Sequence, residues 1–145
     1  MDFLLDTNVV SELMRTAPAV PAPQVLAWFA RNTGGGMYTS AITQAEILAG
    51  IALLPEGKRR NALAGAAEQM FEQEFAERCL AFDSVAAQHY ALAVARRTAV
   101  GWPISTEDGQ IAAIALAAGL PLVTRNTKDF IHIEGLTVID PWQAH

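Results

Sequence analysis

The sequence has a single cysteine, Cys79, and no apolar run long enough to cross a bilayer. One cysteine excludes an internal disulfide framework and a zinc ribbon. The longest apolar stretch, residues 111–123, falls short of the ~20 residues that a bilayer requires, and Gly119 and Pro121 interrupt it. Asp2 stands where a secretory signal peptide would carry positive charge. We therefore expect a cytoplasmic protein with no membrane segment.

Charged residues are also scarce: they make up 17% of the 145 residues, whereas 52% are hydrophobic. This composition excludes an intrinsically disordered chain, and the length suits one domain, which we expect to span residues 1–145. The 10 basic residues are outnumbered by 15 acidic ones, which leaves a net charge of −5. This sign argues against a protein that coats nucleic acid with Lys and Arg. It leaves room for an enzyme that reaches phosphates through bound cations.

Short apolar strands alternate with helical segments along the chain. Five segments have the length and composition of buried strands, residues 3–5, 37–40, 79–82, 122–124 and 136–140. Helical periodicity predicts helices over residues 8–14, 23–32, 43–54, 57–78, 84–100 and 106–118. Thr7 or Asn8 could cap the first helix. Alternation of this kind is typical of a parallel sheet covered by helices on both faces. The expected fold is therefore α/β, with three layers and about five parallel strands.

Three acidic residues stand where the expected fold places ligand chemistry. Asp6 follows the first strand, Glu46 lies one turn into the helix after the second strand, and Asp108 opens a very apolar helix. In an open α/β sheet, ligands bind beyond the carboxyl ends of the strands. Considered alone, each carboxylate has an ordinary explanation as a helix cap or as a partner of the helix dipole. Glu107 competes with Asp108 for such a capping role.

Considered together, the three carboxylates share one explanation. A parallel sheet would bring them to the same edge, where they repel one another unless a cation binds between them. Oxygen ligands in such an arrangement suit Mg²⁺ or Mn²⁺, which bind few carboxylates and keep water molecules for a substrate phosphate. The pattern thus predicts a Mg²⁺ site, with Mn²⁺ as a substitute, that acts on a phosphate group.

The residues around these acids form four motifs. They are Asp6-Thr7-Asn8-Val9 after a short strand, Thr43-x-x-Glu46 followed by Leu48-Ala49-Gly50, Asp108-x-x-Ile111-Ala112-Ala113, and Thr124-x-Asn126-x-x-Asp129-Phe130. Together they resemble the successive motifs of PIN-domain ribonucleases, above all those of the VapC and FitB-like toxins of bacterial type II toxin–antitoxin pairs. The resemblance runs from Asp6 to Asp140 in the family's order. One such motif is weakly specific, whereas four in register point strongly to the family.

This resemblance implies a PIN fold and a Mg²⁺- or Mn²⁺-dependent endoribonuclease that leaves a 5′-phosphate and a 3′-hydroxyl. Asp6 and Asp108 would hold the metal ion, and Glu46 would bind it through water or position the nucleophile. The family's fourth acid falls on Asn126, which is neutral. Asp129, one helical turn further, either replaces that acid or caps a helix. A neutral fourth position would weaken the binding of a second metal ion.

Neighbouring polar residues are expected to support this site. By their positions in the motifs, the residues expected beside the metal ligands or the substrate phosphate are Thr7, Asn8, Thr43 and Asn126. Arg125 and Lys128 could contact flanking phosphates or could serve solubility alone. Trp142 lies beside Pro141 in an expected loop and could serve an interface.

The resemblance also implies partners. They are an RNA substrate and a small antitoxin, whose tail would fill the acidic groove and whose amino-terminal part would bind operator DNA. An acidic toxin suits a basic tail of this kind. A homodimer or a larger toxin–antitoxin assembly is expected from the same resemblance.

Two other functions remain open at this point. A catalytically weak PIN-like module, acting in a complex with a DNA-binding antitoxin, would explain the neutral Asn126, although a pure binder gains nothing from clustered carboxylates. A phosphotransfer enzyme of the haloacid-dehalogenase or receiver type also places an aspartate after its first strand. The dehalogenase type requires Asp-x-Asp there, whereas this chain has Asp6-Thr7-Asn8. A phosphoenzyme trapped on Asp6 would support this alternative.

Overall fold

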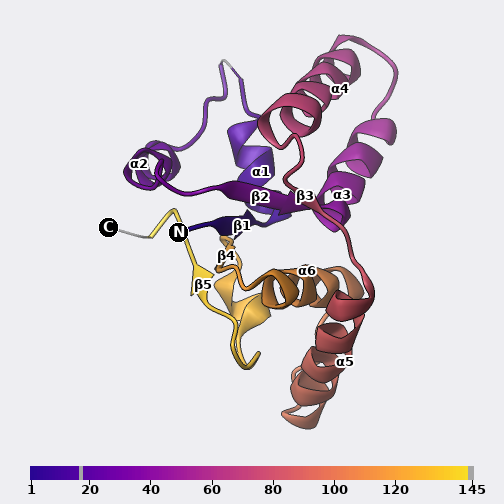
Figure 1. Cartoon of the computed structure of the whole chain (residues 1–145). Helices are drawn as coiled ribbons and strands as arrows, with labels where there is room; N and C mark the ends of the chain where they lie inside the picture. Colours follow the sequence, from indigo (N-terminus) through magenta and orange to yellow (C-terminus); the bar gives the residue numbers. More distant parts are fainter. Residues whose placement is uncertain (17, 144–145) are drawn as a thin grey trace.

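In the computed structural model, which describes residues 1–16 and 18–143, five short strands form one parallel sheet (Figure 1). The strands are β1 (Phe3–Leu5), β2 (Met37–Ser40), β3 (Cys79–Leu80), β4 (Leu122–Val123) and β5 (Val138–Ile139). Their spatial order is β3-β2-β1-β4-β5, which places β1 at the centre. Every neighbouring pair runs parallel. The predicted parallel sheet of about five strands is therefore confirmed.

Helices cover both faces of this sheet. They are α1 (Thr7–Leu13), α2 (Pro23–Arg31), α3 (Ala41–Ala52), α4 (Lys58–Gln69), α5 (Ser84–Ala99) and α6 (Thr106–Ala118). Two shorter elements are the π-helix η1 (Met70–Glu74) and the 3₁₀-helix η2 (Thr127–Phe130). Figure 1 shows α1, α3 and α4 on one side of the sheet and α5 and α6 on the other, which gives the three layers expected. None of the helices in the described part of the chain has the length and apolarity that crossing a bilayer demands.

The side chains of β1 enter two different hydrophobic clusters, because successive residues of a strand point to opposite faces of the sheet. Phe3 and Leu5 pack with α1, α2, α3, α4 and η1, whereas Leu4 packs with α5, α6 and η2. All three side chains are buried. Directly after them, the backbone N–H of Asp6 donates to the carbonyl of Val123 at 2.9 Å. The central strand thus fixes Asp6 at the carboxyl edge of the sheet.

The start of α6 is positioned by close packing against α5. Gly109 is buried, and a Cβ at this position would lie only 2.8 Å from Cε1 of Tyr90 on α5. The glycine therefore permits an approach that any larger residue would obstruct. Residues 111–115 follow as a fully buried run, and α6 ends where Gly119 adopts a φ of 68°. This glycine stop agrees with the predicted end of the helix.

The long helix predicted over residues 57–78 is wrong beyond Gln69. The chain widens there into η1, in which the N–H of Phe75 donates to the carbonyl of Met70 at 2.9 Å. Phe75 and Phe71 are both buried against the cluster that contains Leu5. Glu77 then adopts a positive φ of 62°, and the chain enters β3. The 3₁₀-helix η2 was not predicted either, because its four residues are too few to show a periodic pattern.

The structure decides between the helix caps that the sequence allowed: the capping role considered for Asp6 is confirmed, whereas the one considered for Asp108 is not. Asp6, rather than Thr7 or Asn8, caps α1, because its Oδ1 accepts the N–H of Thr7 at 2.8 Å. Ser105, rather than Asp108, caps α6, and its hydroxyl oxygen accepts the N–H of Asp108 at 3.2 Å. Since Ser105 caps the start of α6, the carboxylate of Asp108 is not needed for that role.

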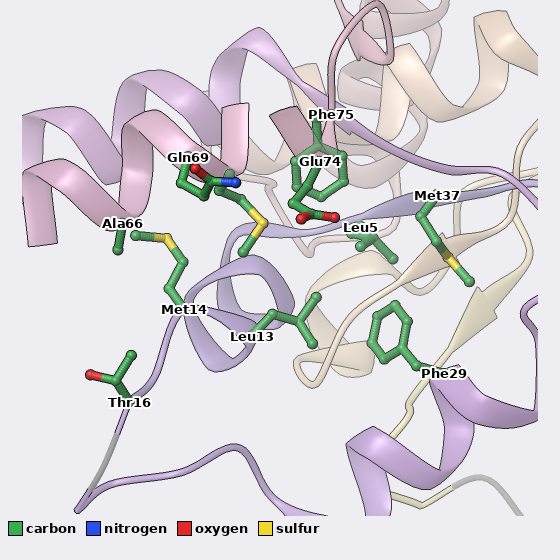
Figure 2. Close-up of a pocket in the computed structure, with 11 residues that line it drawn as sticks. Leu5, Leu13, Met14, Thr16, Phe29, Met37, Ala66, Gln69, Glu74 and Phe75 are labelled. Atoms are coloured by element: carbon green, nitrogen blue, oxygen red, sulfur yellow. The ribbon is translucent and has the colours of Figure 1, made fainter. Parts of the chain in front are cut away.

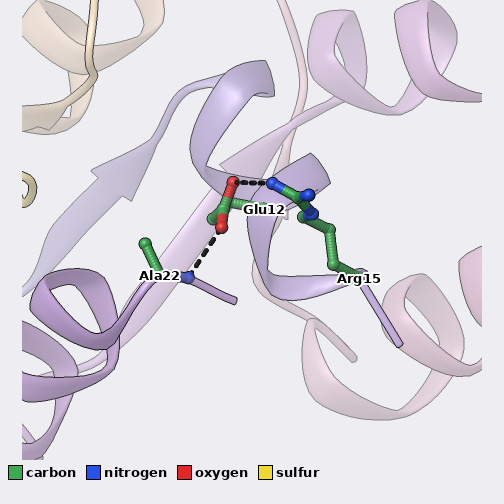
Figure 3. Close-up of polar contacts among 3 residues, drawn as sticks. All are labelled: Glu12, Arg15 and Ala22. Carbon is green, nitrogen blue, oxygen red and sulfur yellow. Dashed lines mark hydrogen bonds and ion pairs between the residues drawn. The ribbon is translucent and has the colours of Figure 1, made fainter. Parts of the chain in front are cut away.

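Another buried carboxylate belongs to the fold and not to the sheet edge. Glu12 is 8% exposed, and its Oε2 accepts the N–H of Ala22 at 2.7 Å (Figure 3). Its Oε1 lies 3.3 Å from Nη1 of Arg15. Because Ala22 is the residue before the first residue of α2, this hydrogen bond ties the start of α2 to α1.

Candidate functional site

Asp6 lies at the centre of the carboxyl edge of the sheet, directly beyond β1. Its side chain is 4% exposed, and both of its oxygens accept hydrogen bonds. Oδ1 accepts the backbone N–H of Thr7 at 2.8 Å. Oδ2 accepts the hydroxyl of Thr124 at 2.7 Å and the side-chain amide of Asn8 at 3.3 Å. All these donors are neutral, and no cation of residues 1–16 and 18–143 forms an ion pair with Asp6.

Thr124 connects the loop after β4 to the start of α1. Its fully buried hydroxyl donates to Asp6 and accepts the side-chain amide of Asn8 at 3.2 Å and the backbone N–H of Asn126 at 3.1 Å. The side-chain oxygen of Asn8 accepts the backbone N–H of Arg125 at 3.1 Å. The structure thus brings Asn8 and the 124–126 segment together around the carboxylate, as the motifs led us to expect.

Glu46 reaches the same edge from α3. The hydroxyl of Thr7 donates to Oε1 of Glu46 at 2.6 Å and lies 3.0 Å from the hydroxyl oxygen of Thr43. Thr43 is fully buried, and its N–H donates to the hydroxyl oxygen of Ser40, the cap of α3. Glu46 itself is exposed, and among the described contacts its second carboxylate oxygen accepts no hydrogen bond.

Asp108 lies on the first turn of α6 and is partly buried. Burial raises its pKa from 3.8 to about 6, and the negative charge of Asp6 is the next largest cause. A hydrogen bond with the side chain of Ser105 lowers the pKa, while the charges of Asp129 and Glu46 raise it further. Asp108 is therefore close enough to the other three acids to respond to their charges.

The same acids act on Asp6. Burial raises its pKa above 3.8, the hydrogen bonds from Thr124 and Thr7 lower it, and the charges of Glu46 and Asp129 raise it. Opposite effects of this kind arise when a carboxylate is held by donors but shares its surroundings with other negative charges. Four carboxylates thus form one region of negative potential at the edge of the sheet.

The fourth member of this group is Asp129 of η2. Its charge raises the pKa of both Asp6 and Asp108. Asn126 is exposed, and within the described residues it contacts Thr124 through its backbone N–H. Of the two alternatives for the family's fourth position, the structure brings Asp129 into the acidic group. Glu107 is exposed and is not among the charges that shift either aspartate.

The donor set of this group fits a small, hard divalent cation. Among residues 1–16 and 18–143, no group of three or more His, Cys, Asp and Glu side chains could hold a metal ion by itself. Mg²⁺ does not need such a cage, because it usually binds through one or two carboxylates and keeps several water molecules. Asp6 and Asp108 are the candidates for such a pair: burial raises both pKa values, and the charges of neighbouring carboxylates, which a cation would offset, raise them further.

Sequence reasoning missed Arg97, a buried cation on the last turn of α5. Its side chain is 2% exposed, and its guanidinium donates to the carbonyls of Trp102, Asp129 and Ile131 at 2.6, 2.7 and 3.3 Å. It therefore fastens the end of η2, which carries Asp129, to α5. Helical phase could have found it, since Arg97 follows the buried Ala93 by four residues.

An apolar pocket of about 470 Å³ lies apart from the carboxylate group (Figure 2). Leu13 of α1, Met14 directly after it, Phe29 of α2 and Phe75 after η1 are among the side chains that surround it. Glu74 is its single acidic residue. This lining suits apolar side chains of a ligand or partner and offers little for hydrolysis of a phosphodiester.

Comparison with known proteins gives one consistent family. The family model described as PIN domain matches residues 3–136. The chain is 44% identical over 142 residues to the plasmid stability protein StbB of Pseudomonas syringae pv. tomato, covering 98% of this chain and 99% of that protein. It is 41% identical over 141 residues to the VapC ribonuclease Y4jK of Sinorhizobium fredii, with 97% and 98% covered. It is 40% identical over 140 residues to the toxin FitB of Neisseria gonorrhoeae, again with 97% and 98% covered.

The fold has solved counterparts as well. The structure of FitAB bound to the IR36 DNA fragment matches with a TM-score of 0.85 and 37% sequence identity. The match covers 99% of this chain and 97% of the chain in that structure. Sequence and structure comparisons therefore extend over almost the same residues.

Proposed function

The chain belongs to the PIN-domain family, and on this premise we propose that it is a Mg²⁺-dependent endoribonuclease, the toxin of a type II toxin–antitoxin pair. The observation that carries the proposal is the group of four carboxylates, Asp6, Glu46, Asp108 and Asp129, at one edge of the sheet. Within the described residues this group includes no paired cation. Such an arrangement is favourable when a metal ion and a phosphodiester complete it.

The residues have separable roles in hydrolysis. Bound Mg²⁺ would stabilise negative charge on the phosphodiester oxygens and lower the pKa of a water molecule. Asp6 and Asp108 would hold the ion, and Thr124 and Asn8 fix the orientation of Asp6 through their hydrogen bonds. Glu46 is exposed and held on one oxygen by Thr7, which leaves its other oxygen to orient the attacking water.

Cleavage of a mixed RNA pool by the purified chain tests this function. With Mg²⁺ or Mn²⁺ we expect cleavage that leaves a 5′-phosphate and a 3′-hydroxyl, and with EDTA we expect none. Folded protein that binds RNA or a partner but cuts nothing under any of these conditions would support a binding module. Covalent labelling of Asp6 by a phosphate donor would support a phosphotransfer enzyme instead.

We expect Asp129→Asn to raise the Mg²⁺ concentration that gives half-maximal cleavage by about tenfold, because the variant removes negative charge near the metal-binding pair. Asn126→Ala is the matched control, since the described contact of Asn126 with Thr124 uses only the backbone N–H. The measurement is a Mg²⁺ titration of the cleavage rate. Equal effects of the two substitutions would contradict the assignment of Asp129 to the fourth position.

The stability of the metal-free protein should fall as the pH rises from about 4 through 6. The pKa of Asp108 is raised to about 6, so the folded state holds a proton that the unfolded state releases near 3.8. The proton on Asp108 therefore stabilises the folded state fully below pH 3.8. This stabilisation is lost as the pH rises through the folded pKa of about 6. Thermal unfolding between pH 4.5 and 7.5 measures the dependence of the melting temperature on pH, which Asp108→Asn should reduce.

Mg²⁺ should raise the melting temperature by several degrees at pH 7.5 and by less at pH 5, where protonated Asp108 competes with the metal ion. A Mg²⁺ effect independent of pH would contradict this prediction.

The partners follow from the same proposal. We expect a small antitoxin to bind this chain, cover the acidic group with its tail and contact operator DNA, and we expect the complex to act in the cytoplasm. Two observations support such a partner: the similarity to FitAB, whose structure contains a DNA fragment, and the apolar pocket of Figure 2. A homodimer of this chain remains part of the same prediction, which the mass of the purified protein in solution would test.

A further inference from the structure

Arg125 lies next to the acidic group but does not pair with it. The residue follows Thr124, whose hydroxyl donates to Asp6. In the described part of the chain its guanidinium forms neither an ion pair nor a hydrogen bond. Instead, the guanidinium carbon lies 4.8 Å from the centroid of the Trp142 ring. This cation therefore contacts an aromatic face and, among the described residues, pairs with none of the four carboxylates.

Both ends of Arg125 are held in place. The side chain of Asn8 accepts the backbone N–H of Arg125 at 3.1 Å, and the amide of the same Asn8 donates to Asp6. At the other end, Trp142 is partly buried against the hydrophobic cluster that contains Leu5. The backbone N–H of Trp142 donates to the side chain of Asp140 at 2.9 Å, and this hydrogen bond holds the backbone that carries the ring. An exposed arginine is thus ordered before any ligand binds.

The guanidinium held in this way suits a phosphate group. Contact with an aromatic ring uses the flat face of a guanidinium and leaves the N–H groups along its edges, which match two phosphate oxygens at once. Because the side chain is already ordered, binding loses less conformational entropy than it would for a free arginine. A positive contact beside the metal site would also favour binding, since the chain has a net charge of −5 and an RNA backbone is negatively charged along its whole length.

We propose that Arg125, held by Trp142, binds a backbone phosphate of the RNA strand adjacent to the phosphate that is cleaved. The inference rests on the proposed function, because that function brings an RNA backbone to this edge. Arg125 is then a substrate-binding residue, and Trp142 is a positioning residue that acts through it. The contact recognises the sugar–phosphate backbone and carries no base specificity by itself.

The test measures binding separately from cleavage. The Asp6→Asn protein, with Mg²⁺ present, is titrated into a 5′-fluorescein-labelled single-stranded RNA of mixed sequence, and the anisotropy is followed at several salt concentrations. Adding Arg125→Ala should weaken binding roughly tenfold. It should also reduce the salt slope, which is the slope of log affinity against log salt concentration, by the amount that corresponds to about one phosphate contact. Arg125→Lys should keep most of the salt slope but lose affinity, because it keeps the charge and loses the two-point contact.

Trp142 gives the readout that a general loss of charge would not produce. Trp142→Phe keeps an aromatic face and should retain most of the affinity, whereas Trp142→Ala should weaken binding as Arg125→Ala does. The double variant should bind no more weakly than Arg125→Ala alone, since the two residues form one unit. In the otherwise unchanged enzyme, Arg125→Ala should raise KM more than it lowers kcat.

Lys128 supplies the matched control, because it is an exposed cation on η2 whose ammonium group, among the described residues, has none of the contacts that hold Arg125. Lys128→Ala should change RNA affinity less than twofold. An equal loss for Lys128→Ala and Arg125→Ala, or additive effects of Arg125 and Trp142, would overturn the inference. Unchanged affinity in Arg125→Ala, while the wild type still cleaves RNA, would also refute it and leave the proposed function intact. A wild type that neither binds nor cleaves RNA would instead refute the proposed function.

Discussion

Asp6→Asn is expected to reduce Mg²⁺-dependent RNA cleavage at least about 100-fold, because it removes a charged metal ligand from the centre of the site. The substitution changes one atom of a side chain that is 4% exposed, so the shape of the site is retained. Initial rates on the same RNA pool, with wild-type and variant protein at equal concentration, give the measurement. Cleavage by the variant at the wild-type rate would remove Asp6 from the proposed mechanism.

The fold should survive this substitution. Asp6 caps α1 through Oδ1, and asparagine is as effective a cap as aspartate. An asparagine side chain has only one acceptor oxygen, so the hydroxyl of Thr124 and the side-chain amide of Asn8, which both donate to Oδ2 in the wild type, must rearrange locally. Removing a carboxylate whose pKa is raised by burial also relieves its repulsion from Glu46 and Asp129. Because the relief of repulsion offsets this local rearrangement, we expect a melting temperature within a few degrees of that of the wild type at pH 7.5.

Glu107→Gln is the control for charge removal. Glu107 lies one residue before Asp108, is exposed, and does not shift the pKa of either aspartate. Its substitution should leave the cleavage rate within about twofold of the wild type, since exposed changes away from a site rarely matter. A large loss in Glu107→Gln would mean that the rate follows the net charge of this surface and not the metal-binding pair.

The position of the site could be predicted from the sequence because it follows from topology. Asp6 follows a buried strand and Asp108 opens an apolar helix, and a parallel sheet brings strand ends and helix starts of this kind to one edge whatever the details of packing. The way in which Glu46 joins them could not be predicted, because it depends on a hydrogen bond from Thr7 across 39 residues of chain. The α/β fold could be predicted for a similar reason, because alternating strands and helices can be arranged in only a few ways.

Two of the unpredicted features depend on contacts that leave no periodic pattern, whereas the third, Arg97, shares the helical phase of the buried Ala93. The end of the helix after Gln69 results from packing of Phe71 and Phe75, whose spacing equally fits a continuous helix. Asp129 could not be separated from Asn126 by motif spacing alone, because the short helix η2, which begins after Asn126 and contains Asp129, brings the charge of Asp129 close to the acidic group. Arg97 carried a charge that ordinarily marks a solvated surface.

Arg97→Met is expected to lower the free energy of unfolding by about 3 kcal/mol, because it leaves three inward carbonyl groups without their donor. Those carbonyls belong to Trp102, Asp129 and Ile131, so the substitution frees both the turn after α5 and the end of η2. Urea denaturation at pH 7.5 gives the measurement. Arg96→Met, at an exposed position one residue earlier, should change the same quantity by less than about 0.5 kcal/mol.

Arg97→Lys separates the loss of charge from the loss of geometry. Lysine keeps a buried cation but cannot direct donors from Nε and Nη1 to carbonyls on two different segments, as Arg97 does. We expect an intermediate loss of stability and a higher Mg²⁺ requirement for cleavage, since the residue that carries the Asp129 carboxylate loses its anchor. That increase should disappear in an Asp129→Asn background, where the carboxylate to be positioned is absent. Equal destabilisation by Arg97→Met and Arg96→Met would instead mean that the buried guanidinium contributes nothing to holding η2 beside the acidic group.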